Sequence, residues 1–174
     1  TKDLQQAADD LLIHKQRLTG VIETAMDGII TINDQHQIIL VNPAAASIFG
    51  YEVNDLMGAS LDIVIPMRHR HVHGSHVNQF GERGTTRRKM GSRFDDYYVT
   101  GLHANGTEFP LEASISSLIE NEKRFFTVIF RDISERKAAK EKMAQYHSEL
   151  TQLSSALQSI REEERKHIAR ELHD

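Results

Sequence analysis

From Ser134 to the end of the chain at Asp174 there is no glycine and no proline, and the large apolar residues recur at alternating intervals of three and four. Residues at these intervals share one face of an α-helix, and the 3.5-residue period is that of a coiled coil. The segment therefore predicts one long helix with an apolar seam. Two arrangements remain open: a dimeric stalk, which the length of the seam favours, and a single helix laid on its own domain. The seam consists of Met143, Tyr146, Leu150, Leu153, Leu157 and Ile160.

The period of the seam breaks after Ile160. An uninterrupted seam would place Glu164 and His167 in its core, so we expect a shift of register near Glu164, as in a stutter. The region therefore divides into a coiled-coil signalling helix over 134–160 and a second helical segment over 161–174.

The first residues of the chain also lack glycine and proline, and Leu4, Leu11 and Leu18 recur every seven residues. This spacing predicts a short amphipathic helix over 1–19 with a narrow apolar stripe. The stripe suits packing on a partner helix or on the chain's own domain, and both alternatives remain open.

The middle of the chain has the turns and alternating apolar residues of an α+β domain. Two strands, several short helices and three more strands predict a five-stranded antiparallel sheet with helices over one face. A stretch over 81–93, with three glycines and five Lys or Arg residues, predicts a mobile loop. The predicted strands cover residues 28–33, 37–41, 96–102, 108–118 and 124–132, and the main predicted helices cover 43–49 and 67–80.

Several short motifs occur in a fixed order along this domain. Together they resemble the pattern of PAS domains, small sensor modules of signalling proteins, and the resemblance implies a PAS sensor domain over 20–133 with helices flanking it. The motifs are Asp27-Gly28-Ile29-Ile30, Val41-Asn42-Pro43-Ala44-Ala45, Phe49-Gly50-Tyr51, Asn105-Gly106-Thr107-Glu108-Phe109-Pro110-Leu111-Glu112 and Arg131-Asp132-Ile133-Ser134.

Two polar residues of these motifs have a physical role available. The amide of Asn42 can bond backbone groups at the junction between a strand and a helix. Asp132 lies where the last strand becomes the C-terminal helix, so a change in the sheet can reach that helix through this junction. We expect both residues to be structural and not to bind a ligand.

The last thirteen residues carry a second motif. Glu162, Arg165 and the run from Ile168 to Asp174 match Glu-x-x-Arg-x-x-Ile-Ala-Arg-Glu-Leu-His-Asp. This resembles the start of the phosphoacceptor helix in one branch of bacterial sensor histidine kinases, and it implies that His173 accepts the phosphoryl group, with Asp174 as its neighbouring acid. A phosphoacceptor needs a neutral, exposed ring nitrogen, which an adjacent carboxylate can orient and make more basic. The alternative is a solvated helix end that finishes in His-Asp.

The predicted helix over 67–80 contains four histidines. Three of them, His69, His73 and His76, can share one face, but without cysteine or a clear carboxylate set nearby they make a poor zinc site.

His73 has a second interpretation, which comes from resemblance. Counted from Pro66, His73 falls where haem-binding, oxygen-sensing PAS domains carry their proximal histidine. The resemblance implies that a neutral imidazole there could ligate haem iron. On the distal side those domains have Arg or Met, whereas the matching position here is Tyr97 or Tyr98. A histidine that packs on the sheet, or lines an empty or small-molecule pocket, remains the alternative.

Composition excludes several classes of function. The net charge of -4 does not favour nucleic acid as a partner. With no cysteine in the chain, disulfides, thiolate chemistry and the flavin photo-adduct are all excluded. No apolar run reaches the length of a membrane span and the N-terminus does not resemble a signal peptide, so we expect a cytoplasmic fragment without a membrane segment.

These observations lead to one preferred function. We expect a sensor and signal-transmission fragment of a two-component histidine kinase, which forms a homodimer through its helices and serves a response regulator through its parent kinase. The fragment shows no Gly-rich phosphate loop, so catalysis is expected to belong to the parent chain. Two alternatives are a haem-based gas sensor with His73 as axial ligand and a ligand-free PAS module used for dimerisation.

Overall fold

The computed structural model describes residues 1–82, 87–90 and 99–173 and divides the chain into two units, Thr1–Ile133 and Ser134–Asp174. The second unit is a single helix, α5 (Ser134–His173). The first unit contains α1 (Lys2–Thr24), β1 (Gly28–Ile32), β2 (Ile38–Val41), α2 (Pro43–Phe49), α3 (Val53–Leu56), the 3-10 helices η1 (Leu61–Val64) and η2 (Met67–His69), α4 (Arg70–Glu82), β3 (Arg87–Met90), β4 (Val99–Leu102), β5 (Glu108–Glu120) and β6 (Lys123–Asp132).

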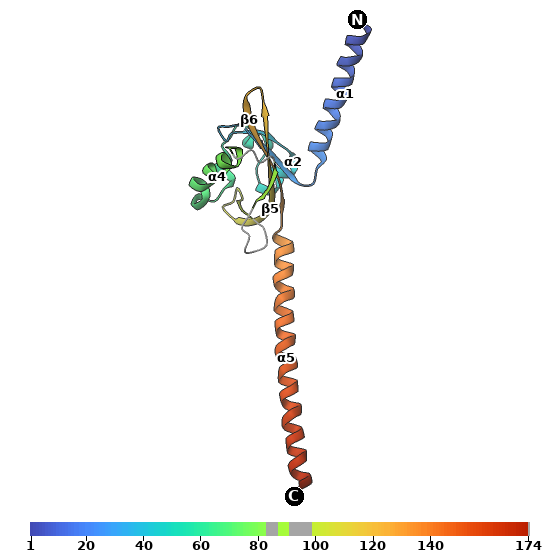
Figure 1. Cartoon of the computed structure of the whole chain (residues 1–174), viewed down its shortest axis with the longest axis vertical. Coiled ribbons are helices and arrows are strands. Elements are labelled where there is room, and N and C mark those ends of the chain that lie inside the picture. Colours follow the sequence, from blue (N-terminus) through green and yellow to red (C-terminus); the bar gives the residue numbers. More distant parts are fainter. Residues whose placement is uncertain (83–86, 91–98, 174) are drawn as a thin grey trace. The chain divides into compact units, whose positions relative to one another are not determined.

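The strands form one antiparallel sheet in the order β2-β1-β6-β5-β3, with β4 also paired to β5. Figure 1 labels two neighbouring strands of this sheet, β5 and β6. Met90 lies opposite Ala113, and Val99 lies opposite Leu111. β3 and β4 therefore follow one another along the same edge of β5, and six strands occupy five positions. This confirms the predicted five-stranded antiparallel sheet.

The predicted loop over 81–93 is wrong in two places. Residues 81 and 82 complete α4, and Arg87–Met90 form strand β3 on β5. The open edge of a strand offers unpaired backbone donors and acceptors, and a basic segment can pair with it whatever its side chains. The composition of the segment indicated a loop, because the pairing of its backbone with β5 does not depend on its side chains. The remainder of the predicted loop lies outside the described residues.

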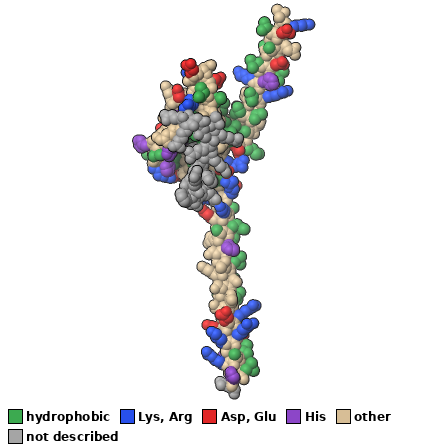
Figure 2. Space-filling model, in the orientation of Figure 1, with side chains coloured by type: hydrophobic (Ala, Val, Ile, Leu, Met, Phe, Trp, Pro, Cys, Tyr) green, Lys and Arg blue, Asp and Glu red, His purple; other side chains and the backbone are tan. Residues whose placement is uncertain are grey.

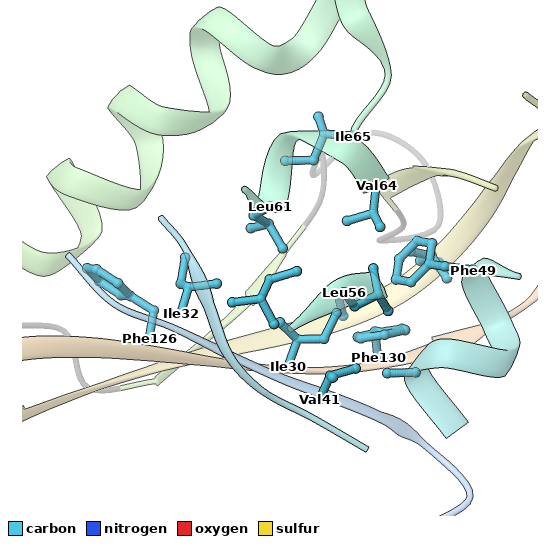
Figure 3. Packing of buried hydrophobic residues seen from close by; sticks show 14 of the residues in the cluster. Ile30, Ile32, Val41, Phe49, Leu56, Leu61, Val64, Ile65, Phe126 and Phe130 are labelled. Carbon is cyan, nitrogen blue, oxygen red and sulfur yellow. The ribbon is translucent and has the colours of Figure 1, made fainter. Parts of the chain in front are cut away.

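The hydrophobic core lies between the sheet and the short helical segments. Figure 3 shows Ile30, Phe126 and Phe130 on the strands with Leu61 and Val64 facing them from η1. Full burial of one such side chain contributes about 1.5–3 kcal/mol, so this layer is the main source of the domain's stability.

The two outer helices differ from the core because none of their residues is buried. α1 continues to Thr24, past the predicted end at Thr19, because one glycine inside a helix costs only about 1 kcal/mol and Gly20 does not stop it. α5 starts at Ser134, as predicted, and its 40 residues correspond to roughly 60 Å of helix. Hydrophobic side chains lie at the surface along both helices (Figure 2).

Candidate functional site

Asn42 forms the centre of a hydrogen-bond network at the start of the domain. It is 0% exposed and caps α2, its Oδ1 accepting from the backbone N–H of Ala45 at 3.0 Å and of Ile29 at 2.8 Å. Its Nδ2 donates to the carbonyl oxygens of Ile22 and Asp27, both at 3.0 Å. One side chain thus joins the end of α1, the start of β1 and the start of α2. This confirms the structural role predicted for Asn42 at the strand-to-helix junction.

An ion pair joins the first strand to the last. Nε of Arg131 donates to Oδ1 of Asp27 at 2.9 Å, and Nη2 of Arg131 donates to Oδ2 at 3.1 Å. The hydrogen bond with Asp27 raises the pKa of Arg131, and the charge of Asp27 adds to this shift. Sequence analysis missed this pair, although Asp27 and Arg131 both belong to motifs that it identified.

The chain leaves the sheet through Ile133. Its side chain is 5% exposed, and its backbone N–H donates to the carbonyl oxygen of Pro110 at 3.1 Å. Asp132, the last residue of β6, lies opposite Leu111 of β5. The residue immediately before α5 is therefore held to the sheet by both a buried side chain and a backbone hydrogen bond.

A second ion pair holds the segment that leads into α4. Arg68, in η2, makes a two-fold contact with Glu108 at the start of β5, and its Nη2 donates to Oε2 at 2.7 Å. The hydrogen bond with Arg68 lowers the pKa of Glu108, and the charge of Arg68 contributes to this shift. This pair also escaped sequence analysis, because its partners are 40 residues apart.

His73 lies on the face of α4 that packs against the domain. Val77 and Phe80, four and seven residues further along the helix, are both buried in the core, and His73 itself is half-buried. Burial lowers the pKa of His73, and the charge of His36 lowers it further. Both effects favour the neutral form of the His73 imidazole. The other histidines of this segment, His69, His71 and His76, are exposed.

The turn between β1 and β2 contacts α4 next to His73. The Nε2 atom of His36 lies 3.3 Å from Oδ1 of Asn78, and a side chain at Gly74 would meet the ring of His36 at 3.4 Å. Asp62 of η1 is near enough to oppose the lowering of the His73 pKa. The ring of His36 in the hairpin turn thus lies against α4 at Asn78 and Gly74.

The described residues give a test of metal and haem binding. Within residues 1–82, 87–90 and 99–173, no three His, Asp or Glu side chains form a group that could hold a metal ion. Of the four histidines of residues 67–80, His73 lies on the core-facing side of its helix, as an axial haem ligand would have to. The rings of Phe80 and Phe126 lie 6.4 Å apart between α4 and the sheet, and a macrocycle in that position would have to separate them. Tyr97 and Tyr98 lie outside the described residues.

His173 is the last residue of α5, and it is exposed. The other histidine in this part of the helix, His167, has its Nε2 3.4 Å from Oε1 of Glu171. Asp174, the predicted neighbouring acid, lies outside the described residues.

The apolar seam of α5 is exposed along its length, with Leu150 at 64% and Leu153 at 58%. No helix in the described part of the chain is long and apolar enough to span a membrane.

Comparison with known families identifies the domain. The family profile described as PAS domain matches residues 26–135. The chain belongs to the PAS domain family. The fold agrees: a crystal structure of the PAS domain of an HTR-like protein from Haloarcula marismortui superimposes with a TM-score of 0.61 at 19% identity, covering 74% of this chain and 99% of that one.

Several curated relatives of this PAS protein are named as sensors or histidine kinases. Sensor protein FixL of Bradyrhizobium diazoefficiens is 25% identical over 86% of this chain and 29% of its own length. Cell-division control histidine kinase PdhS of Brucella anthropi is 26% identical over 88% of this chain and 14% of its own length. Oxygen sensor protein DosP of Escherichia coli is 25% identical over 82% and 17%. The chain therefore spans less than a third of each relative.

Proposed function

We propose that this chain is the sensor and signal-transmission part of a two-component histidine kinase, in which the PAS domain controls a dimeric α5 ending at the phosphoacceptor His173. One observation carries the proposal: α5 begins at Ser134, with only Ile133 between it and the last strand, and continues without interruption to His173. The relation to histidine kinases such as PdhS supports it.

The sequence motif and the exposure of His173 support its role as acceptor. An exposed, neutral imidazole can attack the γ-phosphorus of ATP, so that a nitrogen–phosphorus bond forms and the bond to ADP breaks. ATP would be held by another part of the parent kinase, and the phosphoryl group would then pass to a response regulator. Asp174 would orient the ring and raise its basicity.

The signal would travel through the junction at Ile133. A change in the sheet, caused by an input, would alter how the end of β6 presents α5, and a rotation or register shift of the dimeric helix would change access to His173. Such a transition requires two states that the input favours unequally. The hydrogen bond from Ile133 to Pro110 and the Arg131–Asp27 pair are the contacts through which we expect the sheet to act.

The acceptor is tested in the complete parent kinase. His173→Gln should abolish autophosphorylation and leave ATP binding unchanged, whereas His167→Gln, a matched exchange six residues earlier, should keep most of the labelling. Retained labelling in His173→Gln would show that another residue accepts the phosphoryl group.

A second candidate is a haem-based gas sensor, favoured by the neutral, core-facing imidazole of His73. When bound, haem would supply a gas-binding iron, and His73 would be its protein ligand. DosP, a relative by sequence, is named as an oxygen sensor.

The absorption spectrum of protein expressed with ample haem tests this candidate. If a Soret band appears, His73→Ala should remove or convert it, while His69→Ala and His71→Ala should leave it unchanged. A colourless protein would exclude the haem proposal.

A further inference from the structure

α1 has an apolar stripe that the described part of the chain leaves uncovered. Leu4 is 77% exposed, Leu11 70%, Leu18 66% and Val21 67%, and no residue of the helix is buried. A side chain of the domain holds α1 at its C-terminal end, where the carbonyl oxygen of Ile22 accepts from Nδ2 of Asn42. A row of large apolar side chains at this exposure indicates a surface that a partner covers.

The spacing of the stripe defines the kind of partner. With Leu4, Leu11 and Leu18 at the a positions of a heptad, the d positions are Ala7, His14 and Val21. This is the heptad pattern of a coiled-coil seam, and the seam contains one polar side chain, His14. A single polar residue in such a seam specifies which residues face each other across the pair.

The charges that flank the seam fit a second copy of α1 in parallel orientation. Asp10 occupies a g position and Lys15 the following e position. In a parallel pair these positions lie next to each other across the interface. Asp10 of each copy would therefore meet Lys15 of the other copy, and the two ion pairs would flank the level of His14.

We propose that α1 pairs in parallel with α1 of a second copy, and that the facing His14 side chains make this pairing sensitive to pH. This inference concerns a second interface, separate from the seam of α5. It rests on the proposed function, because the dimer formed by α5 would hold the two copies together. A helix of 23 residues forms a weak pair by itself, but attachment to an existing dimer raises its effective concentration.

The chemistry of the imidazole provides the pH sensitivity. Two neutral imidazoles can share a hydrogen bond, because one nitrogen donates and the other accepts. Two protonated imidazoles have only donors, repel each other and resist removal from water. Histidine changes its charge between pH 5 and 8, so the pairing should weaken as the pH falls through this range.

The charged groups facing His14 come from the two copies of α1, since His14 is exposed in the single chain. Asp10 lies one turn before it, Arg17 lies one turn after it, and Lys15 is adjacent. In the proposed pair, Asp10 forms an ion pair with Lys15 of the other copy. Because Lys15 is paired with Asp10, Arg17 is the cation that adds to the repulsion that protonated His14 would meet.

The experiment uses spin labels, because the chain has no cysteine of its own. A label at Gln5→Cys, outside the stripe, reports the distance between the N-terminal ends of α1 in the two copies by pulsed electron resonance. A parallel pair predicts a short, narrow distance at pH 8 that becomes longer and broader at pH 5. His14→Leu should keep the distance short at both pH values, and His71→Gln, which removes an exposed histidine of α4, should respond to pH as the unchanged chain does.

The outcomes separate this inference from the proposed function. A second label at Gln152→Cys, beside the seam of α5, reports whether the dimer exists. Paired α5 helices with distant α1 labels, or with an antiparallel α1 spacing, would overturn the inference and leave the dimer intact. A short α1 distance with no dependence on pH would remove the role of His14. Unpaired labels at both places would overturn the proposed dimer itself.

Discussion

Arg131 and Asp27 are 104 residues apart in sequence, and Nε of Arg131 donates to Oδ1 of Asp27 at 2.9 Å. The pair connects the residue before the first strand with the strand that leads into α5. Because both side chains are partly exposed, the contact contributes little to folding, and its effect is expected on the coupling between the sheet and the helix.

Breaking this pair should change signalling more than stability. Arg131→Gln or Asp27→Asn should lower the free energy of unfolding by less than about 1 kcal/mol, the upper range for an exposed ion pair. In the parent kinase, the same variants should alter the ratio of autophosphorylation with and without the input. The exchanged double variant, Asp27→Arg with Arg131→Asp, serves as a control and should restore part of the response. Single variants with an unchanged ratio would show that the pair does not take part in output.

Asn42 should be the polar residue whose loss costs most in this domain. Asn42→Ala removes the cap of α2 and leaves two backbone carbonyl oxygens and two backbone N–H groups without their partner. An unsatisfied buried group costs about 1–3 kcal/mol, so we expect a loss of about 3 kcal/mol or more in urea unfolding. Asn33→Ala is the matched control: Asn33 only bridges the exposed turn to Gln35 and Gln37, and its loss should cost about 1 kcal/mol. Similar losses for the two variants would contradict the central role of Asn42.

The apolar seam of α5 should hold the dimer. Replacing Leu150 and Leu153 together by Glu places like charges in the seam, and the fragment should become monomeric by light scattering. The control is Gln152→Glu with Ser155→Glu, which adds the same charges at positions that point away from the seam and should leave the dimer intact. A dimer that survives the seam variant would place the interface on α1 or on the PAS domain.

His73 should make the stability of the domain dependent on pH. The unfolded chain protonates His73 near the ordinary histidine pKa of about 6.5, while burial keeps the folded pKa lower. Well above both of these pKa values, His73 is neutral in the folded and the unfolded chain and does not change the free energy of unfolding with pH. As the pH falls below about 6.5 the unfolded state takes up the proton first, and stability decreases until the pH reaches the folded pKa.

Urea unfolding at about pH 7.5 and pH 5 measures this effect, the two values lying on either side of the ordinary histidine pKa. His73→Gln should reduce the loss of stability on acidification, because glutamine does not titrate. His71→Gln, at an exposed position of the same helix, should leave the loss as it is in the unchanged chain. An identical pH dependence in all three proteins would show that His73 does not contribute.

Much of the architecture could be predicted from local patterns. The uninterrupted helix from Ser134, the hairpin after Gly28 and the cap at Asn42 depend on residues close together in sequence, where periodicity and capping chemistry act directly. The strand Arg87–Met90 could not be predicted, because its pairing depends on the open edge of β5, which exists only once the sheet has formed.

The residues with candidate functions divide in the same way. The sequence by itself determined the motif that ends in His173, the seam of α5 and the heptad of α1, since each is a repeating or contiguous pattern on one helix. Only the tertiary structure decided that His73 is the half-buried one among the four histidines of residues 67–80. It also decided that Arg131 meets Asp27 and that Arg68 meets Glu108. These contacts join segments that are distant in sequence. The segments are brought together when the sheet and helices pack and bury apolar area, and this burial is non-directional, so the local sequence does not show which segments will meet.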